Sequence, residues 1–131
     1  MSTPATALRN AAHSGDSVQV KNLLLENVDP NVTDEHGRTA LSHASGAGHL
    51  AIVEALLVAG AWVNPHEDYD TYETPLMTAA ESGRFAIVIR LVEAGADPSL
   101  HVGWAQRTPE SYARDRGYIE IANYLAGVKR P

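Results

Sequence analysis

The stretch Thr39–Asn64, TALSHASGAGHLAIVEALLVAGAWVN, decides how this chain folds. It holds a Thr that is followed nine residues later by a Gly, then by an Ile-Val pair and a Leu pair. The same frame appears four times, preserved to different degrees, at Thr6/Gly15, Thr39/Gly48, Thr74/Gly83 and Thr108/Gly117. The steps between successive Thr residues are 33, 35 and 34 residues. A fixed period in this range is typical of proteins built from stacked repeats.

Each copy of the frame predicts two short helices. In the second copy, apolar residues recur at helical spacing on both sides of Gly48, which makes the turn between the helices. Thr39 is placed to cap the first helix with its hydroxyl, and Gly37 stands where a tight turn needs positive φ. The predicted core of this copy is Leu41, Ala44, Ile52, Val53, Leu56 and Leu57.

The first copy is predicted to begin at Thr6, with a first helix over residues 7–14 that Gly15 ends. Its second helix carries polar Gln19 and Lys21, and the last copy carries Glu110 where the first three copies have Leu. A stack of repeats must present a polar face at each end. These two copies are therefore predicted to be the caps.

Four phased copies of this frame over residues 6–126 resemble the ankyrin-repeat family, in which a β-turn precedes two helices. The resemblance implies an all-α solenoid of four helix-turn-helix repeats joined by β-hairpin loops. It implies one domain over residues 1–131, with repeats at about 4–34, 35–69, 70–103 and 104–128. It also implies non-enzymatic protein binding on a concave face formed by hairpin tips and the exposed sides of the first helices.

The whole chain has 131 residues, no cysteine and no long uninterrupted apolar run. The length suits one compact domain. The absence of cysteine excludes disulfides and thiolate chemistry, and fits a reducing compartment. We therefore expect a soluble, cytoplasmic protein that is monomeric when free.

The net charge of −6 is unevenly spread, because residues 26–81 hold ten acids and one base, Arg38. This block carries −9 and the remainder carries +3. Localised negative charge disfavours nucleic acid and anionic membranes as partners and favours a basic protein surface.

The positions that the ankyrin-repeat family leaves free lie just before each capping Thr and each inter-helix Gly, so the resemblance implies that recognition occurs there. The loop at 64–73 is longer than its counterparts and combines acids with Tyr, which anchors interfaces well. The alternative is that this loop is simply solvated. The predicted partner-binding residues are Glu35, His36, Arg38, Glu67, Asp68, Tyr69, Asp70, Tyr72, Glu73, Glu81, Trp104 and Arg107.

Trp62 replaces the Asp that follows Gly-Ala or its equivalent elsewhere in the chain, and we expect it to support the base of the long loop rather than to contact a partner. No metal or cofactor is predicted, because the histidines form no HExxH or Cys/His pattern and no glycine-rich phosphate loop is present. The set Ser42, His43 and Asp34 lacks a nucleophile elbow.

The sequence therefore predicts a binding module that serves as an inhibitor, an immunity-type protein or an adaptor. The main alternative is a structural scaffold or assembly subunit that uses its caps or its convex face. An enzyme is the third and weakest reading, since acids at a polar loop tip are not desolvated as acid–base catalysis requires.

Overall fold

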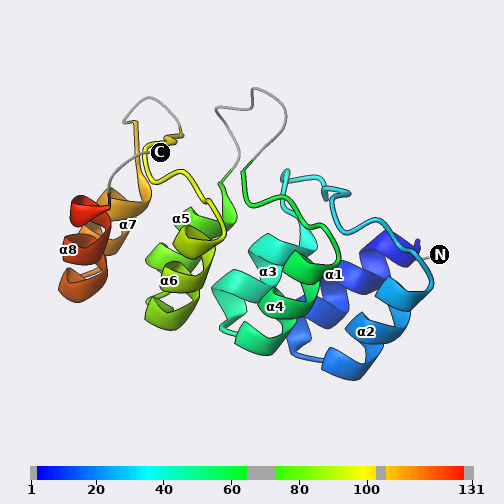
Figure 1. The fold of residues 1–131 in the computed structure, drawn as a ribbon. Coiled ribbons are helices and arrows are strands. Elements are labelled where there is room, and N and C mark those ends of the chain that lie inside the picture. Colours follow the sequence, from blue (N-terminus) through cyan, green and yellow to red (C-terminus); the bar gives the residue numbers. More distant parts are fainter. Residues whose placement is uncertain (1–2, 65–72, 103–105, 129–131) are drawn as a thin grey trace.

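The computed structural model describes residues 3–64, 73–102 and 106–128. These residues form eight helices in four consecutive pairs (Figure 1). They contain no β-strand, only an isolated antiparallel bridge between Val102 and Arg107. The predicted all-helical solenoid is thus confirmed. The helices are α1 (Pro4–Ser14), α2 (Ser17–Leu25), α3 (Ala40–Ala47), α4 (Leu50–Val58), α5 (Pro75–Glu81), α6 (Phe85–Glu93), α7 (Pro109–Asp115) and α8 (Ile119–Gly127).

The helices stack in two rows. The inner row consists of α1, α3, α5 and α7, each packed on the next, and α2, α4, α6 and α8 form the outer row. The two helices of each pair also pack on each other. The described parts of the connections that lead into α3, α5 and α7 lie on the same side of the stack (Figure 1). Short inner helices rich in Ala permit this close stacking, while the outer helices contribute larger apolar side chains.

The core follows the predicted frame. In the second pair Leu41, Ala44, Val53 and Leu56 are fully buried, together with Ile52, whereas Leu57 is only partly buried and packs at the edge of the core. One contiguous cluster connects buried residues from α1 to α8. Burial of one Leu side chain contributes about 2 kcal/mol, so this cluster is the main stabilising feature of the stack.

Threonine caps set where the inner helices begin. The Thr39 hydroxyl accepts a hydrogen bond from the Ser42 N–H, and Gly37 has φ of 74° in the turn before it, as predicted. Thr74 and Thr108 cap α5 and α7 in the same way, each followed by Pro.

The predicted start of the first helix was wrong. Helix α1 begins at Pro4, not at residue 7, and its cap is Thr3, whose hydroxyl accepts from the N–H of Thr6. The reason is local: Thr3-Pro4 repeats the Thr-Pro pair that starts α5 and α7. Pro at the first helical position has no N–H to leave unpaired and already holds a helical φ.

Neighbouring pairs also interlock at the turns between helices. The His49 ring lies over Gly15, where an added Cβ would be 2.7 Å from the ring, and Nε2 of His49 is 3.1 Å from the carbonyl oxygen of His13. Tyr118 covers Gly83 equivalently. Glycine is therefore needed at these turns for two reasons: it adopts the positive φ, and its lack of a side chain permits the close approach of the next pair.

Candidate protein-interaction face

The inner row and the connections preceding it carry most of the charged contacts between pairs. We call this surface the inner face and define it by the described members of the predicted set: Glu35, His36, Arg38, Glu73, Glu81 and Arg107. Glu35 and His36 are exposed in the turn before α3, with His36 Nε2 3.6 Å from a Glu35 carboxylate oxygen.

Four charged side chains link three pairs across this face. Arg38 lies before α3 with Nη2 3.8 Å from a carboxylate oxygen of Glu73, which stands before α5. Glu73 in turn contacts Glu81, whose carboxylate accepts a 2.9 Å hydrogen bond from Arg116 at the end of α7. Burial raises the pKa of Glu73, the Glu81 charge raises it further, and attraction to Arg38 and Arg107 opposes both. The structure thus brings together residues that the sequence could only place separately.

Arg107 belongs to the same cluster through Tyr112, a residue that was not predicted. The Arg107 guanidinium lies 4.4 Å from the centroid of the Tyr112 ring and donates a 2.6 Å hydrogen bond to Asp115. Tyr112 is buried, and its pKa is raised by that burial and by the nearby charge of Glu73. Such a cation–π contact fixes the guanidinium on the surface. One feature of the sequence could have identified Tyr112: it is an aromatic residue at the position where α3 and α5 have His43 and Thr78.

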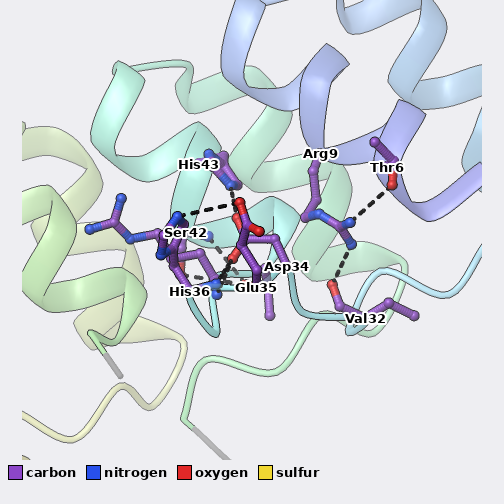
Figure 2. Close-up of polar contacts among 10 residues, drawn as sticks. Thr6, Arg9, Val32, Asp34, Glu35, His36, Ser42 and His43 are labelled. Carbon is purple, nitrogen blue, oxygen red and sulfur yellow. Dashed lines mark hydrogen bonds and ion pairs between the residues drawn. The ribbon is translucent and has the colours of Figure 1, made fainter. Parts of the chain in front are cut away.

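A second cluster lies between α1, α3 and the turn before α3 (Figure 2). Oδ1 of Asp34 accepts hydrogen bonds from the backbone N–H groups of His36 and Arg38, at 2.8 and 3.0 Å. Oδ2 accepts a 3.0 Å bond from His43 Nε2. Burial alone would raise the pKa of Asp34, but these hydrogen bonds together hold it below its usual range.

The other wall of this cluster is formed by Arg9. Its guanidinium donates to the carbonyl oxygen of Val32 at 3.0 Å and to the hydroxyl of Thr6 at 3.1 Å (Figure 2). Between the walls lies an open pocket of ≈ 380 Å³, which is within the size range of small-molecule sites. The sequence pattern assigns no role to Asp34 or His43, so it misses this contact between residues nine apart.

The same region does not assemble a nucleophile. Ser42 is buried, and its hydroxyl lies 3.5 Å from the hydroxyl of Thr39. Among the described residues no hydrogen bond joins Ser42 to His43. Nucleophilic catalysis needs that contact, so the described geometry gives no support to a Ser-His-Asp site. Nor do the described ranges hold a group of three or more side chains that could bind a metal ion.

Half of the predicted binding residues cannot be placed. Glu67, Asp68, Tyr69, Asp70, Tyr72 and Trp104 lie outside the described residues. The prediction that Trp62 packs against the long loop also concerns residues outside the described ranges. Trp62 itself is 45% exposed, and its backbone N–H donates to Asn31. Within residues 3–64, 73–102 and 106–128, none of the helices has the length and apolar character that crossing a membrane requires.

Fold and surface together define a class of protein: a solenoid of stacked helix pairs whose inner row presents charged and polar side chains. The model of a protein family described as "Ankyrin repeats (3 copies)" matches residues 8–102, which is more than half of the chain. The chain belongs to the ankyrin-repeat family, as the sequence indicated. The helices α7 and α8 extend the same architecture beyond the matched range.

Several known proteins are similar over most of the chain. Cyclin-dependent kinase 4 inhibitor B of Bos taurus is 33% identical over 118 residues, which cover 90% of this chain and 88% of the relative. RelA-associated inhibitor of Mus musculus is 34% identical over 130 residues, which cover 97% of this chain but only 15% of that protein. The putative ankyrin repeat protein YahD of Escherichia coli (strain K12) is 37% identical over 102 residues, 74% of this chain and 50% of the relative. The family and the relatives named as inhibitors support a protein-binding role for this chain.

Proposed function

We propose that this protein is a non-enzymatic inhibitor or adaptor that is monomeric when free and docks on a basic surface of another protein through its inner face. The observation that carries this proposal is the cluster of Arg38, Glu73, Glu81 and Arg107, which spans three helix pairs. Charged side chains that ion pairs hold in place at the ends of stacked helices present a fixed pattern to a partner and lose little conformational entropy on binding.

The charge pattern supports a basic partner. On the described inner face Glu81 is matched by Arg116, and Asp115 by Arg107, so these acids are already neutralised. Glu73 also has an ion pair, with the partly exposed Arg38 at 3.8 Å, but it differs from the other acids because it is half-buried beside the carboxylate of Glu81. A cation from a partner would relieve the repulsion between Glu73 and Glu81. The further acids of residues 67–70 would add long-range attraction.

The role as inhibitor or adaptor is supported by the relatives. Two of them carry the word inhibitor in their names, one for cyclin-dependent kinase 4 and one associated with RelA. The cyclin-dependent kinase 4 inhibitor B relative is covered over 88% of its length. We propose that this chain also acts by covering a surface of its partner. We propose that the residues of this chain that contact the partner are the twelve predicted from the sequence.

The experiment that tests this function is affinity capture from the native source, with proteins identified by mass spectrometry. The intact chain is compared with a variant in which Asp68, Asp70 and Glu73 are changed to Lys. A partner captured by the wild type and lost from the variant supports the proposal. A partner retained equally by both contradicts it, and a partner lost only when Glu110 is changed would indicate a scaffold acting through its caps.

A further inference from the structure

The outer row carries a groove that the inner-face function does not use. It lies between α2 and α4 and has a volume of ≈ 520 Å³. Its most prominent side chains are Leu25 and Val58, which are 81% and 89% exposed, and the small side chains of Ala51 and Ala55 complete the apolar lining. Leu25 and Val58 line the same groove, so their apolar surface is contiguous, which is the arrangement that marks interaction sites rather than scattered exposed residues.

Comparison between the repeats shows that the fold does not require these apolar residues. Leu25 and Val58 each stand ten residues after an inter-helix glycine, and the third and fourth repeats carry Glu93 and Gly127 there. Glu93 is exposed on α6 in the same architecture. The apolar pair is therefore confined to the first two repeats, where the groove lies.

The charges at the groove differ between its two walls. Lys21 stands on α2, and Glu54 stands at the equivalent position on α4. Glu54 is already engaged by an ion pair with Arg90 from α6. Lys21 makes no ion pair with any residue of the described segments. Of the two charged side chains at the groove, Glu54 has an ion-pair partner within the described segments and Lys21 does not.

We infer that this groove binds an amphipathic helix of a protein partner, whose apolar stripe packs between Leu25 and Val58 and whose carboxylate side chain faces Lys21. Two neighbouring helices present a furrow that suits the ridge of a third helix, with apolar contacts repeating every three or four residues. The chemistry is opposite to that proposed for the inner face, which selects basic groups. The inference does not depend on the inner-face function, because no residue is shared.

Two helix-stapled peptides test the inference. Both carry Leu at positions i, i+4 and i+7, and the flanks of that stripe are Glu in one peptide and Lys in the other. Binding to the intact protein is measured by fluorescence anisotropy at physiological salt. The net charge of −6 favours the Lys-flanked peptide overall, whereas the groove favours the Glu-flanked peptide. We expect the Glu-flanked peptide to bind tighter, and Lys21→Glu to reverse the preference.

Variants locate the binding site. Leu25→Glu and Val58→Glu introduce the residue that the third repeat carries at this position, so the fold is expected to persist, which a circular dichroism melt checks. Each variant should weaken the binding of the Glu-flanked peptide roughly tenfold or more, since an apolar contact is replaced by a charge. Ile119→Glu, at an exposed apolar residue of α8, is the control and should change nothing. Tighter binding of the Lys-flanked peptide, or undiminished binding by both groove variants, overturns the inference. So does concentration-dependent dimerisation that Leu25→Glu abolishes, because the occupant would then be a second copy of the chain.

Discussion

Oδ1 of Asn64 accepts a 2.8 Å hydrogen bond from the backbone N–H of Asp97, one repeat further along the chain. The same side chain donates from Nδ2 to the carbonyl oxygen of Gly95 at 2.9 Å. Asn31 repeats this arrangement one repeat earlier, with the N–H of Trp62 and the carbonyl of Gly60. Each Asn therefore ties its repeat to the end of the next outer helix, where backbone groups need partners.

Replacement of Asn64 by Ala should lower the free energy of unfolding by ~1–3 kcal/mol, because two backbone groups lose their partners. Urea unfolding followed by circular dichroism measures this change. Asn123→Ala, at an exposed position on α8, is the matched control and should cost less than ~0.5 kcal/mol. Equal stability of the two variants would mean that water replaces the Asn64 contacts fully.

Replacement of Ser45 is predicted to affect stability in the opposite direction. Its side chain is fully buried, and its hydroxyl has no hydrogen-bond partner among the described residues. Ala12 and Ala80 occupy the equivalent positions in the first and third repeats. Ser45→Ala should therefore leave stability unchanged or raise it by up to ~1 kcal/mol, measured as a higher denaturant midpoint. A clear loss of stability would show that the hydroxyl has a partner that the structure does not record.

Leu56 tests the position of the core. It is fully buried on α4 at the centre of the stack. Leu56→Ala should cost ~2–5 kcal/mol, from lost burial plus the cavity left behind. Because repeats are stabilised mainly by their neighbours, the whole array could unfold in one step. A loss under ~1 kcal/mol in a chemical melt would contradict this assignment.

The lowered pKa of Asp34 predicts that the stability of the protein depends on pH, with a defined sign. Its pKa is lower in the folded protein than in the unfolded chain, so its contribution to stability is complete above the unfolded pKa and is lost as the pH falls through the folded pKa. Asp34→Asn should therefore be less stable than the wild type at neutral pH, and the two should converge in acid. Thermal melts between neutral pH and about pH 3 follow this. Glu120→Gln, at an exposed carboxyl, is the control; a gap for Asp34→Asn that persists in acid would refute an electrostatic origin.

The helix pairs could be predicted from the sequence because the frame combines several signals at one spacing. Thr39, Gly48 and Leu56 each fix a different feature, namely the cap, the turn and the core. The start of α1 was missed because Thr6 fits the spacing, whereas Thr3-Pro4 has the better chemistry for a helix start. Spacing alone cannot decide between them.

The site was predicted only as a set of separate positions. Glu73, Glu81 and Arg107 were singled out because packing does not need them, but their contacts depend on how three helix pairs stack. Tyr112 was missed because an aromatic residue on a short helix reads equally well as core. The Asp34–His43 contact crosses a turn whose geometry the sequence pattern does not determine.

The most direct test of the account is the dissociation constant of the captured protein partner for two triple variants. In one, Asp68, Asp70 and Glu73 of the predicted binding set become Lys; in the other, the exposed acids Glu26, Glu93 and Glu120 of the outer row become Lys, which gives the same change in net charge. Isothermal titration calorimetry at physiological salt measures both. We expect the variant in the predicted binding set to bind roughly a hundredfold or more weakly, as loss of several interface charges should, while the outer-row variant stays within about threefold of the wild type. Equal weakening of both variants, or no weakening of the variant in the predicted binding set, would contradict the proposed function.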